Sequence, residues 1–236
     1  MYENIFAKPQ LQPVKMRDVA YDILRQAIIA NKLVPGARLL EEHLARELNV
    51  SRTPLREALK VLENEGFVQR LLSGGYLVAP LSDKELNNLY SIRLVLEGLA
   101  AHQAAQHISE DELEALEEWN GQMKNYWLKQ RNEEALKAGR SFHAVIYRAS
   151  QNENLAILLQ RLGDQIARYR YYSIVHRVPE AHEDHNAILA ALRAHDADGA
   201  ARLSQAHVEV EHRLVLSKMG ERREDDERAQ SVGPGS

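Results

Sequence analysis

From Asp83 to about residue 218, apolar residues recur at the three- and four-residue spacing of a helix, and almost no segment alternates as a strand does. The spacing predicts six or seven helices in this stretch, at about residues 83–106, 110–130, 132–150, 153–177 (with a break near Ser173), 180–194 and 197–218. The segments between them are short and polar, so consecutive helices are expected to pack antiparallel. This pattern limits the larger part of the chain to a helical bundle.

The part of the chain before Pro80 follows another pattern. Helical spacing at about residues 14–30 and 41–48 predicts two helices, separated by the turn signal "PG". A third helix begins near Ser51 and ends at Gly66, a residue suited to the position just past a helix. Two β-prone runs, "FVQRLL" and "YLVAP", then surround a glycine-containing turn and predict a hairpin. Three helices and a hairpin form a winged helix-turn-helix domain. The predicted fold class is therefore mostly α, with that domain followed by an all-α antiparallel bundle.

These patterns divide the chain into four parts. Residues 1–14 contain two prolines and little periodicity, so we expect a flexible arm. Residues 15–80 are the predicted DNA-binding domain, and residues 81–218 are the predicted effector-binding and dimerisation domain. The tail from 219 to 236 consists of Met219 followed by "GERREDDERAQSVGPGS". It is charged and then rich in small residues, which is typical of disorder.

Charge is unevenly distributed between the two predicted domains. Residues 1–80 hold 11 Lys and Arg against 9 Asp and Glu, whereas residues 81–236 hold 19 against 25. The split favours a basic module on an acidic body. The chain has no cysteine, which excludes disulfides and thiolate metal sites, and no apolar run approaches the roughly 20 residues that cross a bilayer. We expect a cytoplasmic protein without a membrane partner.

The stretch "SRTPLREAL" starts the third predicted helix. Ser51 and Thr53 can supply capping oxygens, and Pro54 suits a first turn, where its missing N–H costs nothing. The positions expected to face the core are Leu55, Ala58, Leu59 and Leu62. Arg52 and Arg56 then lie on an outer face. In a winged helix-turn-helix domain this helix enters the major groove, where arginines bind guanine edges or phosphates. The alternative is an ordinary solvated helix face.

The segment "PGARLLEEHLARELNVSRTPLREALKVLENEGFVQRLLSGGYLVAP" resembles the winged-helix domain of GntR-family transcription regulators. The resemblance covers about residues 15–80 and rests on SRTPxREAL followed by LExEGxV. It implies that operator DNA is contacted by Arg52, Thr53, Arg56 and a wing glycine, Gly75. Ser51 is a further donor to the DNA backbone, and Arg38 is a weaker phosphate candidate. Some members of the family carry an arginine where this chain has Glu42.

Three of the ten histidines lie on apolar helix stripes. His207 belongs to a stripe with Leu203 and Val210, His185 precedes Ile188, and His143 follows Phe142. A buried imidazole requires a hydrogen-bond partner or a metal. Each histidine taken alone is more typical of a satisfied core residue. Three on separate helices of one bundle can converge on a divalent ion such as Zn²⁺ or Ni²⁺.

The helical part is similar to the FCD effector domain of the FadR-like branch of the same family. The similarity spans most of residues 83–215 and includes "RLVLEGLAAHQAA", "FHAVIYRASQNENL" and "EDHNAILAALRAHDADGAARLSQAH". Many members bind a metal through one Asp and three His, and the histidines correspond to His143, His185 and His207. The position of the acidic ligand is Gly139, which cannot coordinate. Two interpretations of this site therefore stay open. In one, three imidazoles bind Zn²⁺ or another divalent transition metal, and in the other the histidines form a metal-free polar pocket.

Arg93, on the first helix of the bundle, is the candidate cation that would pair with a small carboxylate effector. In a metal-free polar pocket, the three histidines would hydrogen-bond the same carboxylate. Its alternative is a surface ion pair with Glu97 one turn later.

The predicted function is ligand-responsive transcription regulation, most simply repression. The protein would bind a near-palindromic operator as a homodimer, because two short recognition helices gain affinity by reading two half-sites. Two alternatives are a metal-dependent hydrolytic enzyme and an architectural DNA-binding protein without a ligand. The sequence contains no HExxH motif, phosphate loop or convincing triad, so we expect that the protein is not an enzyme.

Overall fold

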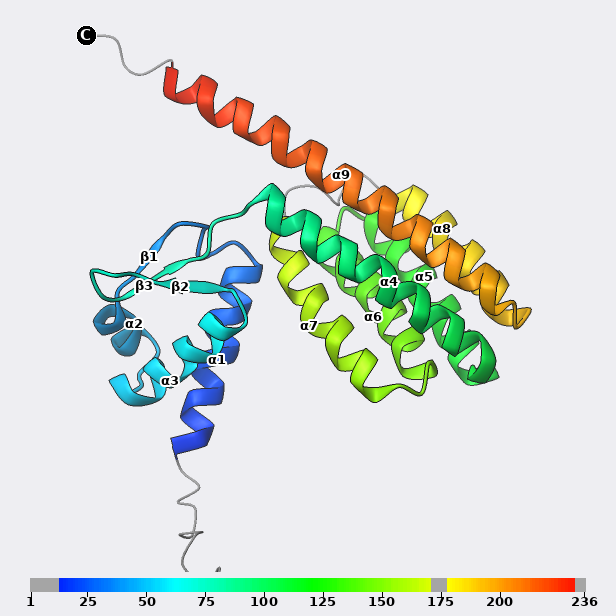
Figure 1. The fold of residues 1–236 in the computed structure, drawn as a ribbon, viewed down its shortest axis with the longest axis horizontal. Helices are drawn as coiled ribbons and strands as arrows, with labels where there is room; N and C mark the ends of the chain where they lie inside the picture. Colours follow the sequence, from blue (N-terminus) through cyan, green and yellow to red (C-terminus); the bar gives the residue numbers. More distant parts are fainter. Residues whose placement is uncertain (1–12, 171–177, 232–236) are drawn as a thin grey trace, which may run out of the picture. The chain divides into compact units, whose positions relative to one another are not determined.

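The computed structural model describes residues 13–170 and 178–231, and the side chains of residues 16–170 and 178–221. These residues form nine helices and three short strands (Figure 1). They divide into two compact units, Met1–Leu81 and Ser82–Ser236. Each unit has its own core, as expected for a chain whose hydrophobic pattern changes at Pro80.

The first unit is a three-helix domain with a small sheet, as the sequence predicts. Its helices are α1 (Pro13–Ile29), α2 (Glu41–Glu47) and α3 (Arg52–Asn64). Its strands are β1 (Arg38–Leu39), β2 (Val68–Arg70) and β3 (Tyr76–Val78), and they form an antiparallel sheet of order β1-β3-β2. The short strand β1 pairs Leu39 with Tyr76, and no alternating pattern in the sequence predicted it. We call the β2–β3 hairpin the wing.

The wing turns tightly because two glycines adopt positive φ angles. Gly74 and Gly75 have φ of 88° and 83°, a left-handed conformation that other residues rarely adopt. The amide of Leu71 donates to the Gly75 carbonyl across the turn (3.0 Å), and Val78 faces Val68 at the base of the hairpin. The hairpin predicted from "SGG" is therefore present.

Helix α3 is held by its inner face and leaves its outer face to solvent. Leu55, Ala58, Leu59 and Leu62 are all fully buried. Gly66 follows the C-cap residue Glu65 with φ of 76°, in agreement with the predicted helix end. The expected cap is different: Ser51 is the N-cap residue by position, but its side chain makes no capping hydrogen bond. Its hydroxyl therefore does not stabilise the helix start.

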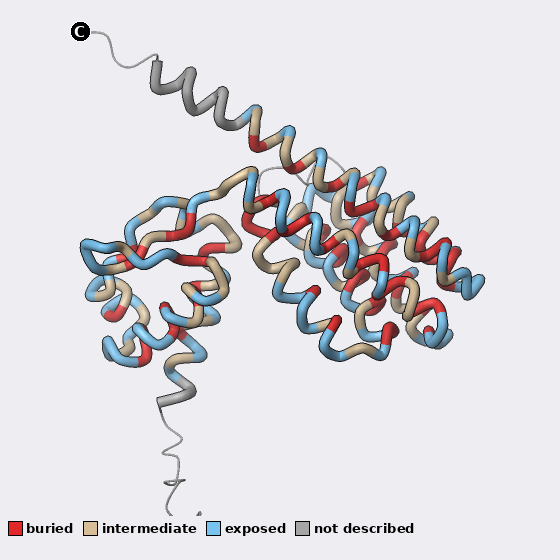
Figure 2. The backbone as a smooth tube through the Cα atoms, in the orientation of Figure 1, coloured by how far each residue is buried: buried red, intermediate tan, exposed pale blue. Residues whose placement is uncertain are grey.

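The second unit is all-helical in its described residues, with helices that follow the predicted order. They are α4 (Asp83–His107), α5 (Glu110–Leu128), α6 (Asn132–Ala149), α7 (Glu153–Arg170), α8 (Val178–Arg193) and α9 (Ala197–Ser231). Figure 2 shows buried positions recurring along one side of these helices, as their spacing predicts. The predicted break near Ser173 lies outside the described residues. No helix of the described chain is long and apolar enough to cross a membrane.

The end of the chain differs from the prediction. A disordered tail from residue 219 was expected, but α9 continues to Ser231. The segment after Met219 is rich in Glu and Arg, which are good helix formers, and it contains no proline before residue 234. A solvated helix also tolerates the single Gly220 at its start. Lys218 pairs with Glu221 one turn later (2.6 Å), which supports continuation of the helix. Charge alone was therefore a poor indicator of disorder here.

Candidate functional sites

The outer face of α3 presents the residues that the sequence singled out for DNA contact. Ser51, Arg52, Thr53 and Arg56 are exposed, at the N-terminal end of the helix. Both arginines are engaged by carboxylates from the start of α2: Arg52 Nη2 lies 3.1 Å from Glu42 Oε1, and Arg56 Nε donates to Glu41 Oε2 at 2.6 Å. Sequence reasoning did not predict these ion pairs.

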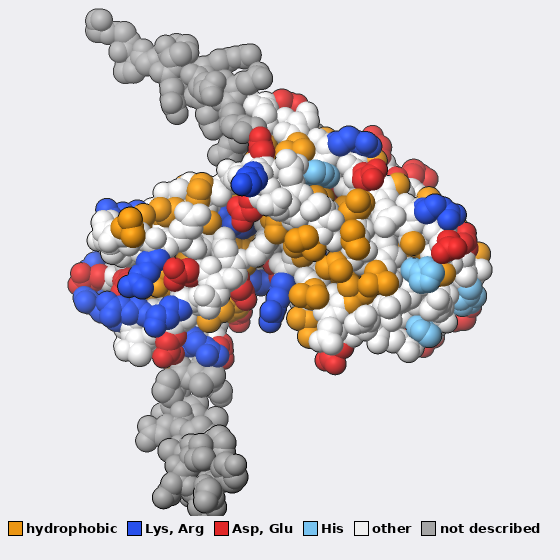
Figure 3. All heavy atoms as spheres, viewed as in Figure 1, with side chains coloured by type: hydrophobic (Ala, Val, Ile, Leu, Met, Phe, Trp, Pro, Cys, Tyr) orange, Lys and Arg blue, Asp and Glu red, His pale blue; other side chains and the backbone are white. Residues whose placement is uncertain are grey.

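A groove of about 450 Å³ lies between α3 and the wing. Its cations are Arg56, Lys60 and Arg70, and the wing glycines form part of its wall. Figure 3 shows Lys and Arg side chains gathered on the first unit where α2, α3 and the wing lie. Lys60 and Arg70 were missed as site residues, although Lys60 lies one helical turn after Arg56. The lining also contains Glu41, so the groove has three cations against one carboxylate, a net positive charge that suits a phosphate backbone.

Of the two remaining DNA candidates, one lies in the wing turn and the other on a strand of the sheet. Gly75 closes the wing turn, and its backbone passes close to Leu39, whose carbonyl oxygen would lie 3.8 Å from a Cβ added at residue 75. Arg38 is exposed on β1, opposite Leu77 of β3. Arg38 therefore lies on the edge strand of the sheet, whereas Gly75 lies in the groove wall.

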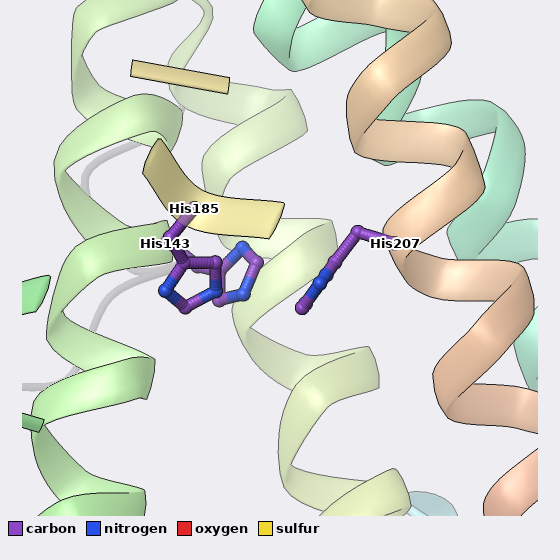
Figure 4. A group of neighbouring side chains, drawn as sticks. All are labelled: His143, His185 and His207. Carbon is purple, nitrogen blue, oxygen red and sulfur yellow. The ribbon is translucent and has the colours of Figure 1, made fainter. Parts of the chain in front are cut away.

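The three histidines selected from apolar stripes come together inside the second unit. His143 of α6, His185 of α8 and His207 of α9 each offer a ring nitrogen, and these nitrogens lie within 4.8 Å of one another. All three side chains are buried. In Figure 4 the imidazoles of α6 and α8 lie next to each other, and His207 points toward them from α9. This arrangement is compatible with binding one metal ion by three imidazoles.

The far nitrogens of two of these rings are held by polar side chains. His207 Nδ1 lies 3.0 Å from Asp184 Oδ2, and His185 Nδ1 lies 3.2 Å from Asn120 Oδ1. Each contact leaves Nε2 as the nitrogen available to a metal. A carboxylate or amide behind a histidine fixes its tautomer and ring orientation, which is typical of metal-binding histidines. Burial lowers the pKa of His207 below its ordinary value, and the Asp184 hydrogen bond only partly offsets that effect, so the neutral ring is favoured.

The position of the missing acidic ligand is filled from another helix. Gly139 lies one turn before His143 on α6, and a Cβ added there would lie 3.1 Å from the sulfur of Met123. Met123 of α5 is buried and lines a small cavity of about 50 Å³ together with Gly139 and the three histidines. Among the described residues, the possible metal ligands that line this cavity are therefore the three imidazoles and the carboxylate of Glu211, and position 139 supplies none.

A buried charge network lies beside the histidines. Arg93 Nε donates to Glu97 Oε1 and Arg93 Nη1 donates to Glu211 Oε1, both at 2.9 Å. Arg170 also pairs with Glu211, and the Tyr147 hydroxyl donates to Glu97 Oε1 (2.6 Å). The predicted Arg93–Glu97 pair thus exists, but it is buried, not on the surface. The pair is buried because Arg93 and Glu97 lie one turn apart on the same inward side of α4, where both are among the buried positions of that helix.

The two carboxylates of this network are held ionised by their surroundings. Burial alone would raise the pKa of Glu97, but His143 and Arg93 outweigh burial and hold the pKa well below its ordinary value. Burial acts in the same direction on Glu211, where Arg170 and Arg93 outweigh it. Two arginines therefore face two carboxylates, so Arg93 is already compensated and is not a free cation for an effector.

The histidine site adjoins a second, larger cavity. This cavity has a volume of about 540 Å³, within the range of small-molecule pockets, and it lies between α6 and α7. Arg93, Arg140, His143 and Arg170 line it, and three of them, Arg140, His143 and Arg170, also line the small cavity. A ligand in the larger cavity would therefore meet Arg140 and Arg170 as well as the imidazole of His143, all of which also line the small cavity.

Comparisons with known protein families decide the identity of both units. Residues 16–78 match the family described as "Bacterial regulatory proteins, gntR family", and residues 88–210 match the FCD domain. The chain belongs to the GntR family and carries an FCD domain. The resemblance inferred from the sequence is thereby confirmed, and so is its consequence for function: the protein is a DNA-binding transcription regulator and not an enzyme.

Relatives and solved structures agree with this assignment. The Nta operon transcriptional regulator of Aminobacter aminovorans is 32% identical over 77% of this chain and 86% of its own length. The HTH-type transcriptional repressor RspR of Escherichia coli is 28% identical over 84% of this chain and 87% of its own length. The solved structure of E. coli McbR/YncC, at 24% identity, covers 86% of this chain and 98% of its own with a TM-score of 0.75, which supports the fold.

Proposed function

We propose that this protein represses transcription by binding a near-palindromic operator as a homodimer, and that a small organic acid releases it from DNA. The acid would bind in the helical unit beside a divalent transition metal held by His143, His185 and His207. The observation that carries the proposal is the combination of an exposed arginine face on α3 with a buried histidine cluster in the other unit. We infer coupling between the two units of about 1–3 kcal/mol, typical of allosteric effectors.

On the DNA side, we propose that Arg52 and Arg56 read base edges in the major groove while Thr53 and Ser51 donate to phosphates. Gly75 would let the wing approach the neighbouring backbone, and Arg38 would add a phosphate contact from the sheet edge. The groove cations Lys60 and Arg70 extend this set. Their exposure supports the assignment, since a side chain that reads DNA must reach beyond the protein surface.

On the effector side, the charge of the donor set favours an anionic ligand. The three imidazoles and Gly139 supply no carboxylate to a divalent ion, and the nearby carboxylate of Glu211 is already paired with Arg93 and Arg170. A small carboxylate would complete both the coordination and the charge, and Zn²⁺ suits three nitrogen ligands with an open position. Arg93 would act indirectly, through Glu97 and Glu211, unless the effector displaces one of those carboxylates.

The ligand response is tested by binding the purified protein to a labelled duplex from its own upstream region. We expect a retarded complex, and we expect one or more acids from a panel of small carboxylates to weaken it by about 5- to 150-fold, the range of allosteric coupling. The same acids should raise the melting temperature, because a ligand that binds only the native state stabilises it. Tight binding that no acid changes would favour the alternative of an architectural protein.

A homodimer requires a surface that a second copy can cover. Helices α4 and α7 expose a continuous row of apolar side chains, which we call the α4–α7 face and which Figure 3 shows as a hydrophobic patch on the second unit. It consists of Ile92, Val95, Leu99, Ile157 and Leu158. On α4 these residues follow a spacing of three and four, so they share one side of the helix. Exposed apolar patches of this kind mark association surfaces.

Val95→Glu should therefore convert a dimer to a monomer. Val95 is 61% exposed, so a charge there costs nothing in an isolated subunit but would be buried without a partner in a dimer. The measurement is light scattering coupled to size exclusion. Val34→Glu, at a similarly exposed apolar residue of the other unit, is the matched control and should leave the mass unchanged. A Val95→Glu protein that remains dimeric would exclude this face as the interface.

A further inference from the structure

The start of α2 carries two adjacent carboxylates, and each pairs with one arginine of the DNA-facing helix. Glu42 lies 3.1 Å from Arg52, and Glu41 lies 2.6 Å from Arg56. The two arginines are one helical turn apart on α3, so the four side chains form two parallel bridges between the helix starts. We call them the α2 carboxylate pairs.

These pairs contribute little to folding. The side chains of Arg52 and Glu42 are 59% and 72% exposed, and exposed ion pairs are worth about 0–1 kcal/mol. Arg56 is equally exposed at 59%, and only Glu41, at 21%, is partly covered, so neither pair is a buried contact on which the fold depends. Their placement beside the residues that face DNA suggests a role in binding.

We propose that Glu42, with Glu41 beside it, determines specificity by making the arginine contacts depend on the base sequence. The inference rests on the proposed reading role of Arg52 and Arg56. A carboxylate next to a guanidinium cancels its attraction for phosphate, which is the main source of sequence-independent binding. Hydrogen bonding to a guanine edge is retained, because each bridge occupies only part of the donor set of its arginine.

The donor geometry supports this division. Arg56 uses Nε toward Glu41, which leaves the two terminal nitrogens of this 59% exposed side chain outside that hydrogen bond. Arg52 uses Nη2 toward Glu42 and retains its other donors. Two parallel N–H groups are what guanine O6 and N7 accept. The carboxylates therefore orient the guanidinium groups and weaken non-specific attraction at the same time.

Glu42→Gln tests the proposal, because glutamine keeps the shape and removes the charge. The probes are a duplex enriched by the wild-type protein from a random library and a scrambled duplex of equal length. We expect affinity for the scrambled duplex to rise about three- to tenfold and its salt slope to steepen by about one, as for one added phosphate contact. Affinity for the enriched duplex should change by less than twofold, so the specificity ratio falls.

Glu47→Gln is the matched control, since Glu47 is exposed on the same helix and the change in net charge is identical. It should leave the specificity ratio unchanged. In an Arg52→Ala background, Glu42→Gln should have no effect, because the residue acts through Arg52. Equal ratios for Glu42→Gln and Glu47→Gln would overturn this inference. An Arg52→Ala protein with wild-type affinity for both duplexes would instead overturn the proposed reading role itself.

Discussion

Replacing Arg52 and Arg56 together by alanine is expected to abolish sequence-specific DNA binding. Each bidentate arginine–guanine contact is worth about 1–3 kcal/mol of discrimination. Loss of two such contacts in each half of a dimer should therefore reduce operator affinity by more than about 100-fold. Both side chains are 59% exposed and outside the core, so the fold should be unaffected. Fluorescence anisotropy with the labelled upstream duplex at fixed salt gives the affinity.

Arg46→Ala with Arg25→Ala serves as the control for this prediction, because it removes the same charge from helices α1 and α2 of the same unit. We expect the control to weaken binding only in proportion to the lost general attraction, with a shallower salt dependence. Circular dichroism should show that both double variants are folded. Retention of operator affinity in the folded Arg52/Arg56 variant would refute the proposed DNA face.

Loss of His185 is expected to remove metal binding. The ring of His185 lies 5.0 Å from that of His143 and 4.9 Å from that of His207, and it stacks on Phe142 with ring centroids 4.0 Å apart, so its orientation is set by packing. In the wild type, Zn²⁺ at 1,000 times its dissociation constant should stabilise the fold by about 4 kcal/mol, or several degrees in melting temperature. His185→Ala should lose this increase, and elemental analysis after dialysis should find no stoichiometric metal.

Two further variants separate coordination from general damage. His102→Ala, at a half-exposed histidine of α4 outside the cluster, should keep the full Zn²⁺-induced increase. Asp184→Asn should keep the fold but weaken Zn²⁺ binding about 10- to 100-fold, because Asp184 orients His207 from behind. If the wild type shows no zinc-dependent increase and holds no metal, the three histidines form the metal-free polar pocket that the sequence left open.

Much of the architecture was predictable from periodicity and turn residues. The inner face of α3, the wing and the helices from Asp83 to Ala149 agree with the structure to within a few residues. The three histidines were selected because each interrupts an apolar stripe, and they do meet. The end of α9 was misjudged, since high charge favours a solvated helix as readily as disorder.

The partners of the site residues were not predictable in the same way. Arg93 and Glu211 are 118 residues apart, and His185 meets Asn120 from 65 residues away. Helical spacing specifies which side of a helix faces inward, but it carries no information on which neighbouring helix lies there or at what height. Glu42 appeared only as a departure from a family pattern, and nothing local indicated that it pairs with Arg52.

By itself, then, the sequence determined the family, the two kinds of domain, the helix whose arginines are exposed and the histidines that face inward, because local spacing and short motifs encode which face of each element is buried. Only the tertiary structure decided that Arg93 is buried and compensated, that Met123 fills the place beside Gly139, and that carboxylates of α2 hold the arginines of α3. Those contacts depend on how helices pack against one another, and packing is a property of the whole fold.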